Sequence, residues 1–123
     1  MQEKLISFKT AKLAKEKGFN IPVWYEYFLN TPNAKAQRAQ TCQNYNSTLY
    51  PNIISAPTQS LLQKWLWENY KLWVGVYHDD NNFDFDITSG KDDTLHFELD
   101  GVYPYDLPEE ALEKGLQEAL KLI

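Results

Sequence analysis

The stretch "ISAPTQSLLQKWLWENY", residues 54–70, combines a helix start signal with a helical apolar periodicity. Pro57 suits a first helical turn because its missing N–H would have no intrahelical partner there. Ser55 or Thr58 can supply a capping oxygen. An apolar stripe follows at Leu61, Leu62, Trp65 and Leu66. These features predict a helix with this stripe in the core.

Two tryptophans of this helix are expected to face opposite ways. Trp67 follows Trp65 by two residues, which turns its side chain by about 160 to 200° around the helix axis. Trp65 belongs to the apolar stripe, so we expect it in the core. Trp67 is therefore a candidate surface aromatic.

A period-two pattern follows the helix in "LWVGVYH" (72–78), "FDFDI" (83–87) and "LHFEL" (95–99). The segments between them, "DDNN" and "TSGKDD", are dense in residues that favour turns. The sequence therefore predicts a three-stranded antiparallel meander with one apolar face. We expect a last helix, over 106–123, to cover that face together with the helix predicted in residues 54–70.

The N-terminal end of the last helix carries the pattern D-x-x-E at Asp106 and Glu109. An N-cap carboxylate and a glutamate three residues later can satisfy two free backbone N–H groups reciprocally. We therefore expect a capping pair there.

The first forty-seven residues predict one helix and two strands. A helix over 7–17 is indicated by Ser7 as N-cap and by Gly18 where a left-handed C-terminal cap is needed. "IPVWYEYFL" (21–29) is rich in aromatic and branched residues and predicts a strand. A second strand near 41–47 is expected to pair with it.

Together these elements predict a single α+β domain over residues 1–123. Their order is α-β-β-α-β-β-β-α. The expected architecture is one antiparallel sheet of four to five strands backed by three helices.

Composition narrows the class of protein. The chain has 123 residues, 43% of them hydrophobic and 24% charged, as in ordinary globular domains. Cys42 is the only cysteine, which excludes an intrachain disulfide and a multi-cysteine zinc site and fits a reducing compartment. No stretch approaches a membrane span in length and hydropathy. We expect a cytoplasmic protein that does not insert in a membrane.

Charge is divided unevenly along the chain. Residues 1–40 carry seven Lys or Arg against three acids, whereas residues 41–123 carry five against fourteen. The acidic part would repel a phosphate backbone. A single-stranded nucleic-acid binder would have to use the N-terminal third, with cations on phosphates and Trp24 or Tyr25 stacking on bases. The cations are Lys9, Lys12, Lys15, Lys35 and Arg38.

Three helical segments also carry a resemblance. "TAKLAKEKGFN", "ISAPTQSLLQKWLWENY" and "EEALEKGLQEALKLI" resemble recurring blocks of a family of small uncharacterised proteins encoded by gut-bacterial phages and related mobile elements. The resemblance covers about a third of the chain. It implies a related fold but supplies no catalytic position, because the family has no established activity.

The outer face of the predicted meander is the best candidate for a metal site. A register with Thr88 opposite Thr94 would bring four potential ligands together, with paired Cβ atoms about 5 Å apart. They are Asp84, Asp86, His96 and Glu98. Mixed carboxylate and imidazole ligation suits zinc or manganese, so a metal-dependent enzyme is one alternative. A solvated sheet face is the other.

Sequence motifs of known enzyme classes are absent. The chain lacks G-x-S-x-G, a Walker phosphate loop, G-x-G-x-x-G and H-E-x-x-H, and no cofactor is implied. We therefore expect a non-enzymatic protein-binding or adaptor module whose partner is another protein, and the acidic part of the chain would suit a basic partner. The candidate binding residues are Trp67, Trp73, Tyr77, Asp79 and Asp80.

Overall fold

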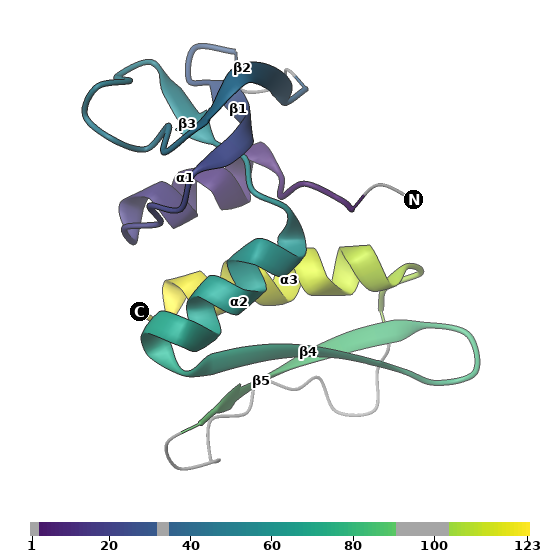
Figure 1. Cartoon of the computed structure of the whole chain (residues 1–123). Helices are drawn as coiled ribbons and strands as arrows, with labels where there is room; N and C mark the ends of the chain where they lie inside the picture. The colour runs from purple at the N-terminus through teal and green to yellow at the C-terminus, as the bar shows by residue number, and fades with distance from the viewer. Residues whose placement is uncertain (1–2, 32–34, 91–103) are drawn as a thin grey trace. The chain divides into compact units, whose positions relative to one another are not determined.

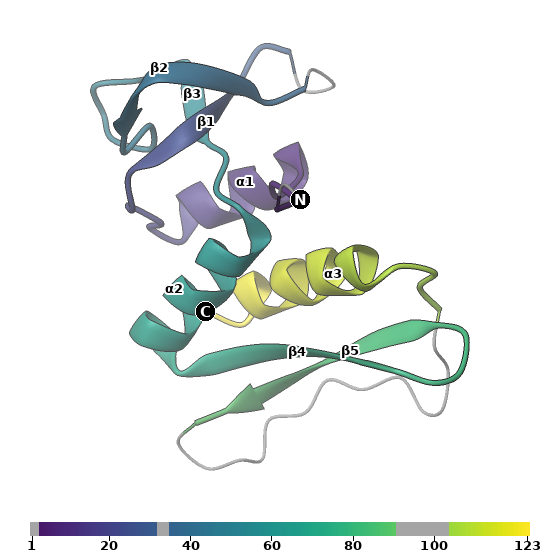
Figure 2. The same ribbon diagram turned by 45° about the vertical axis from the view of Figure 1, so that its right-hand side comes forward.

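The structure is a computed structural model that describes residues 3–31, 35–90 and 104–123. It is α+β, with three helices and five strands in these residues (Figures 1 and 2). The chain divides into two compact units, Met1–Thr58 and Gln59–Ile123. None of the described helices has the length and hydropathy that a membrane span requires.

The first helix, α1 (Phe8–Glu16), confirms the prediction to within one residue at each end. The Ser7 side chain accepts a hydrogen bond from the Thr10 backbone N–H at 3.3 Å, as an N-cap should. Gly18 has φ of +93°, the left-handed conformation that favours glycine after a helix. Both ends of α1 are therefore determined by local sequence.

The sheet of the first unit contains β1 (Val23–Phe28), β2 (Gln37–Gln43) and β3 (Ile53–Ser55), all antiparallel in the order β2-β1-β3. The prediction of a second strand at 41–47 was displaced by four residues. Six of the seven β2 residues are exposed, so this strand carries no apolar alternation that could show its bounds. Strand β3 was missed because three residues are too short for a periodicity.

Aromatic contacts tie the sheet of the first unit to its helix. The Tyr27 hydroxyl donates to the Ile6 carbonyl oxygen at 2.8 Å, and the Tyr27 ring meets Phe8 edge-on at 5.5 Å. Ile54 on β3, which pairs with Tyr27, is fully buried. The core of this unit lies between α1 and the sheet.

The second unit contains α2 (Gln59–Tyr70), β4 (Leu72–His78), β5 (Phe83–Ser89) and α3 (Pro108–Lys121). Strands β4 and β5 form an antiparallel hairpin in continuous register. Figures 1 and 2 show α2 and α3 on the same side of this hairpin, where α3 packs on both strands and α2 packs on β4 and α3. The buried side chains of this core include Leu62, Leu66, Val74, Phe85, Ile87, Leu116 and Leu120.

The expectation of a single sheet was wrong, because the five described strands form two sheets of three and two strands. Strand β1 lies between β2 and β3, so its two hydrogen-bonding edges are both used within the first unit. Strand β3, which the sequence did not predict, therefore occupies the edge of β1 to which the predicted meander would have had to bond to form a single sheet. The predicted strand at 95–99 lies outside the described residues.

The predicted capping pair of the last helix was also wrong. The N-cap of α3 is Leu107, which makes no side-chain capping hydrogen bond, and Pro108 occupies the first helical turn. A proline there needs no partner for an N–H, which reduces the number of groups to be capped. The helix therefore begins two residues later than Asp106.

Candidate functional site

The two neighbouring tryptophans of α2 face opposite ways, as predicted. Trp65 is 5% exposed and belongs to the core of the second unit, whereas Trp67 is 38% exposed. Trp73, on the outer face of β4, is 43% exposed. Two large indoles are thus accessible to solvent near the junction of α2 and β4.

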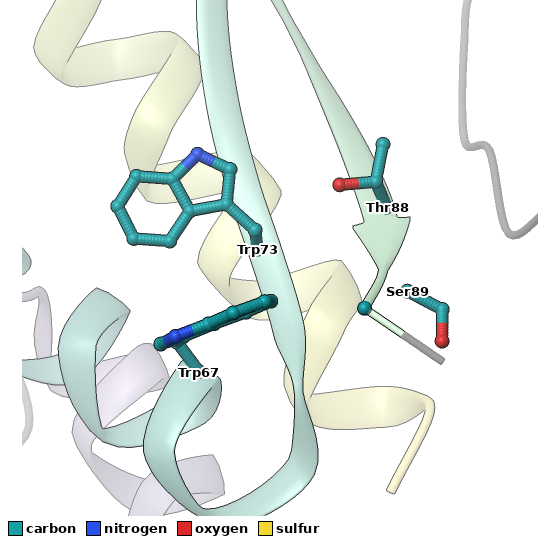
Figure 3. Close-up of a pocket in the computed structure, with 5 residues that line it drawn as sticks. Trp67, Trp73, Thr88 and Ser89 are labelled. Atoms are coloured by element: carbon teal, nitrogen blue, oxygen red, sulfur yellow. The ribbon is translucent and has the colours of Figure 1, made fainter. Parts of the chain in front are cut away.

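These indoles line a hollow of about 380 Å³, which we call the tryptophan hollow (Figure 3). Its lining residues are Trp67, Trp73, Thr88, Ser89 and Gly90. The two indole centroids are 6.4 Å apart and their planes meet at 87°, an edge-to-face arrangement. Figure 3 shows the side-chain oxygen of Thr88 directed toward the indole of Trp73.

The backbone between α2 and β4 brings the two indoles together. Lys71 has φ of +56°, a left-handed conformation that is uncommon for a residue with a Cβ. This residue ends the helix, since its N–H donates to the Trp67 carbonyl oxygen at 3.0 Å. Its own carbonyl oxygen accepts from the Gly90 N–H at 2.8 Å, which extends the hairpin past β5. One residue therefore reverses the chain and places Trp73 beside Trp67.

The shape of the tryptophan hollow depends on a glycine at position 90. A Cβ at this position would lie 2.7 Å from Cη2 and 2.9 Å from Cζ3 of Trp67. Such distances are far shorter than a van der Waals contact, so the indole rests on the backbone of residue 90. The absence of a side chain there sets the position of this wall.

Charged groups border the two indoles. The Lys71 ammonium lies 5.2 Å from the Trp67 ring centroid, a cation–π distance. On the other side, Asp86 faces Gly75 across the hairpin. A Cβ on Gly75 would lie 2.8 Å from Asp86 Oδ1 and 3.8 Å from Trp73 Nε1. The carboxylate and the indole N–H therefore border the same space above Gly75.

Asp84 does not lie in solvent, contrary to the alternative of a solvated sheet face. It is 1% exposed. Its Oδ1 accepts the Phe85 backbone N–H at 2.8 Å, and its Oδ2 lies 3.5 Å from the Tyr77 hydroxyl, which donates to it. The Asp84 carboxylate thus supplies the hydrogen-bond acceptor that the Phe85 backbone N–H would otherwise need from another strand. These bonds give Asp84 a structural role.

The other predicted metal ligands are not brought together within the described residues. Asp86 is two positions along β5 from Asp84, and His96 and Glu98 lie outside the described part of the chain. In residues 3–31, 35–90 and 104–123 there is no group of three or more His, Cys, Asp or Glu suited to a metal ion. The four-ligand site stays a prediction.

In the acidic turn between β4 and β5, one of the two predicted binding residues, Asp79, forms hydrogen bonds within the turn. Asp79 Oδ1 accepts the backbone N–H groups of Asn81 and Asn82, both at 2.8 Å. These hydrogen bonds stabilise the ionised form and lower the pKa of Asp79. Asp79 thus holds the turn, while Asp80 is simply exposed at its tip.

The residues predicted for nucleic-acid binding fall on three elements of the first unit, α1, β1 and β2, and on the segment before β2. Arg38 on β2 lies over Trp24, with 5.0 Å from its guanidinium carbon to the ring centroid, and 6.0 Å from the Tyr25 centroid. Lys9, Lys12 and Lys15 lie on α1, where the Lys12 ammonium is 5.8 Å from the Phe8 ring. Lys35 is exposed just before β2. The aromatic group and the helix lysines are therefore on separate elements.

Comparisons of the chain with protein-family models, with curated proteins and with solved structures gave no match. The resemblance to phage-encoded proteins therefore stays a prediction.

Three lining residues of the tryptophan hollow were missed as site residues. Thr88, Ser89 and Gly90 were assigned to a turn, whereas Thr88 and Ser89 continue β5 opposite Trp73 and Leu72. Their polar side chains gave no sign of a strand. If the second predicted strand, 83–87, had been given the same length of seven residues as the first, 72–78, Thr88 would have been placed opposite Trp73.

Proposed function

We propose that this protein is a non-enzymatic protein-binding module and that the tryptophan hollow is its contact surface. The observation that carries the proposal is the exposure of Trp67 and Trp73 at right angles around one hollow. Buried aromatic anchors dominate the energetics of protein interfaces, and Trp is enriched among them. An adaptor of mobile-element origin, as the resemblance of its helices implies, would act in this way.

The backbone supports this proposal, because it fixes the hollow before a partner arrives. Trp67 rests on Gly90, and the left-handed Lys71 places β4 directly after α2. Preorganised side chains lose less conformational entropy on binding than mobile ones. Two indoles in fixed positions can therefore contribute a large share of their contact energy to affinity.

Recovery and quantitative binding of a partner test the proposal. The immobilised chain is used to recover proteins from its host, and each recovered protein is purified and titrated against the wild type and single variants. Trp67→Ala and Trp73→Ala should each weaken a genuine partner by about thirtyfold, the effect of losing an interface anchor. Trp24→Ala is the matched control, since Trp24 is 44% exposed in the other unit.

The result that would overturn the proposal is a purified partner whose affinity is unchanged by both hollow variants. A partner that responded to Trp24→Ala alone would move the contact surface to β1 and β2. Folding of each variant is checked by its thermal transition, because a lost affinity counts only when the variant is folded.

A further inference from the structure

Two polar groups, the Asp86 carboxylate and the indole N–H of Trp73, border the space above Gly75. Asp86 Oδ1 and Trp73 Nε1 would lie 2.8 Å and 3.8 Å from a Cβ at Gly75, so both border the room that the missing side chain leaves. Gly75 pairs with Asp86, and Trp73 pairs with Thr88, two positions along the same strand. The indole and the carboxylate are therefore neighbours on one face of the hairpin.

Neither the Asp86 carboxylate nor the N–H of Trp73 has a hydrogen-bond partner within the part of the chain that the structure describes, although the Trp73 ring meets that of Trp67 edge-to-face. Among those residues, the Asp86 carboxylate forms no hydrogen bond and no ion pair, and no cation lies over the ring of Trp73. The two other exposed tryptophans differ in this respect. Arg38 lies over Trp24 and Lys71 lies over Trp67. Trp73 is thus an exposed indole with a carboxylate beside it and an open face.

We infer that the partner inserts an arginine side chain here, with its guanidinium on the indole of Trp73 and paired to Asp86. A guanidinium is planar, stacks on aromatic rings and presents a fork of donors that fits a carboxylate. Residues 59–123 carry five lysines against fourteen acids, so the surroundings favour a cation. This inference rests on the proposed function, since the arginine would belong to the segment that fills the hollow.

Other occupants fit the same groups less well. A carboxylate or phosphate would be repelled by Asp86 and by the net charge of the second unit. An ammonium lacks the planar face that stacks on an indole and the fork that pairs with a carboxylate. An uncharged apolar side chain would cover Asp86 and leave its charge without a partner, which is costly. The guanidinium satisfies the ring and the carboxylate together.

Short labelled peptides test this assignment directly. Three probes of the form Gly-Ser-X-Gly-X-Ser-Gly carry arginine, lysine or citrulline at X, and their binding is followed by fluorescence anisotropy. Citrulline keeps the shape of arginine and removes its charge. Measurements at about 20 mM and about 150 mM NaCl separate screened long-range attraction from a close ion pair. The arginine peptide should bind at both salt concentrations and more tightly than the lysine peptide, and the citrulline peptide should bind at least tenfold more weakly.

Asp86→Asn and Asp106→Asn form the matched pair of variants. Both remove one negative charge, but Asp106 is exposed just before α3, beside the Phe83 end of the hairpin. Asp86→Asn should weaken the arginine peptide about tenfold, whereas Asp106→Asn should leave its affinity nearly unchanged. Asparagine keeps the size of the side chain, so Asp86→Asn is not expected to unfold the hairpin.

Two results would overturn the inference. One is the absence of arginine-peptide binding by the full chain at low salt. The other is an equal loss with Asp86→Asn and Asp106→Asn, which would mean non-specific attraction to an acidic unit. A natural partner that lost affinity with Trp67→Ala but not with Asp86→Asn would also refute the arginine assignment, while the proposed function would stand.

Discussion

Gly115 on α3 lies directly against Val74 on β4: a Cβ at position 115 would be 2.5 Å from Cγ1 of Val74 and 3.1 Å from the ring of Phe85. The helix therefore approaches the hairpin more closely than any residue with a side chain would allow. Gly115, Val74 and Phe85 are all buried, so none of them can move into solvent. The core of the second unit depends on this glycine.

Gly115→Ala should therefore destabilise the protein. Alanine favours a helix over glycine by about 1 kcal/mol, but overpacking a filled core costs about 1 to 3 kcal/mol or more. We expect a net loss, measured as a lower denaturant midpoint. Glu110→Ala, at an exposed position of the same helix, is the control and should change the free energy of unfolding little. A more stable Gly115→Ala variant would show that α3 can shift away from the hairpin.

The two tryptophans of α2 should differ strongly in their effect on stability. Trp65→Ala empties a buried aromatic site and should lower the free energy of unfolding by about 3 to 5 kcal/mol. Trp67→Ala should cost much less, because this indole is 38% exposed and lies against the hollow. Equal losses in denaturant titrations would mean that Trp67 is as much a part of the core as Trp65.

Gly90→Ala should reshape the tryptophan hollow with a small effect on stability. The added methyl group would meet the outer end of the Trp67 indole and displace it from its place against residue 90. We expect a changed tryptophan emission spectrum and a change in the free energy of unfolding below about 1 kcal/mol. Asn81→Ala, in the exposed turn at the far end of the hairpin, should leave the emission spectrum unchanged. An unaltered spectrum in Gly90→Ala would mean that the indole does not rest on residue 90.

Elements with strong local periodicity could be predicted from the sequence. The apolar stripe of α2 correctly separated Trp65 from Trp67, and the alternation around Val74 and Phe85 correctly indicated two strands. Local signals also placed α1 between Ser7 and Gly18. In each case the residues of a single element indicate which of its side chains are buried or where it ends, so its neighbours in the fold need not be known.

Features that depend on pairing between distant segments could not be predicted. The division into two sheets follows from β3, three residues long, taking one edge of β1. The tryptophan hollow needs a left-handed Lys71, and neither glycine nor asparagine marks that position. Asp84 looked like a solvated residue because alternation placed it opposite the core side chains. In the structure Asp84 is buried and accepts hydrogen bonds from Phe85 and Tyr77, which a period-two pattern does not show.

Divalent metals should not stabilise the protein beyond the effect of ionic strength. Asp84 already accepts the Phe85 N–H and the Tyr77 hydroxyl, so a metal would have to displace these bonds. A ligand that binds only the folded state must raise the melting temperature. Zinc, manganese or calcium at up to about millimolar concentration should therefore match sodium chloride of equal ionic strength. A specific rise that Asp86→Asn abolished would revive the metal-dependent enzyme.

Glu118 should contribute a pH-dependent part of the stability. Partial burial raises the pKa of its carboxyl group, but hydrogen bonds from Lys114 and Lys121 and the charges of these residues outweigh burial, so the pKa lies below its usual 4.5. The ion-pair distances to Glu118 Oε1 are 3.1 Å from Lys114 and 3.4 Å from Lys121. Since the folded state has the lower pKa, ionised Glu118 stabilises the protein above the unfolded-state pKa. That contribution is lost as the pH falls through the folded-state pKa.

Comparison of the wild type with Glu118→Gln across pH tests this sign. The wild type should be the more stable of the two near pH 7 by up to about 1 kcal/mol, the range for ion pairs near a surface. Below 4.5 the difference should shrink, because the wild-type carboxylate takes up its proton there. Glu110→Gln removes an exposed carboxylate from the first turn of the same helix and is the control for the loss of one negative charge. A difference between the wild type and Glu118→Gln that grew as the pH fell would mean that burial of the carboxyl group outweighs its two lysine partners.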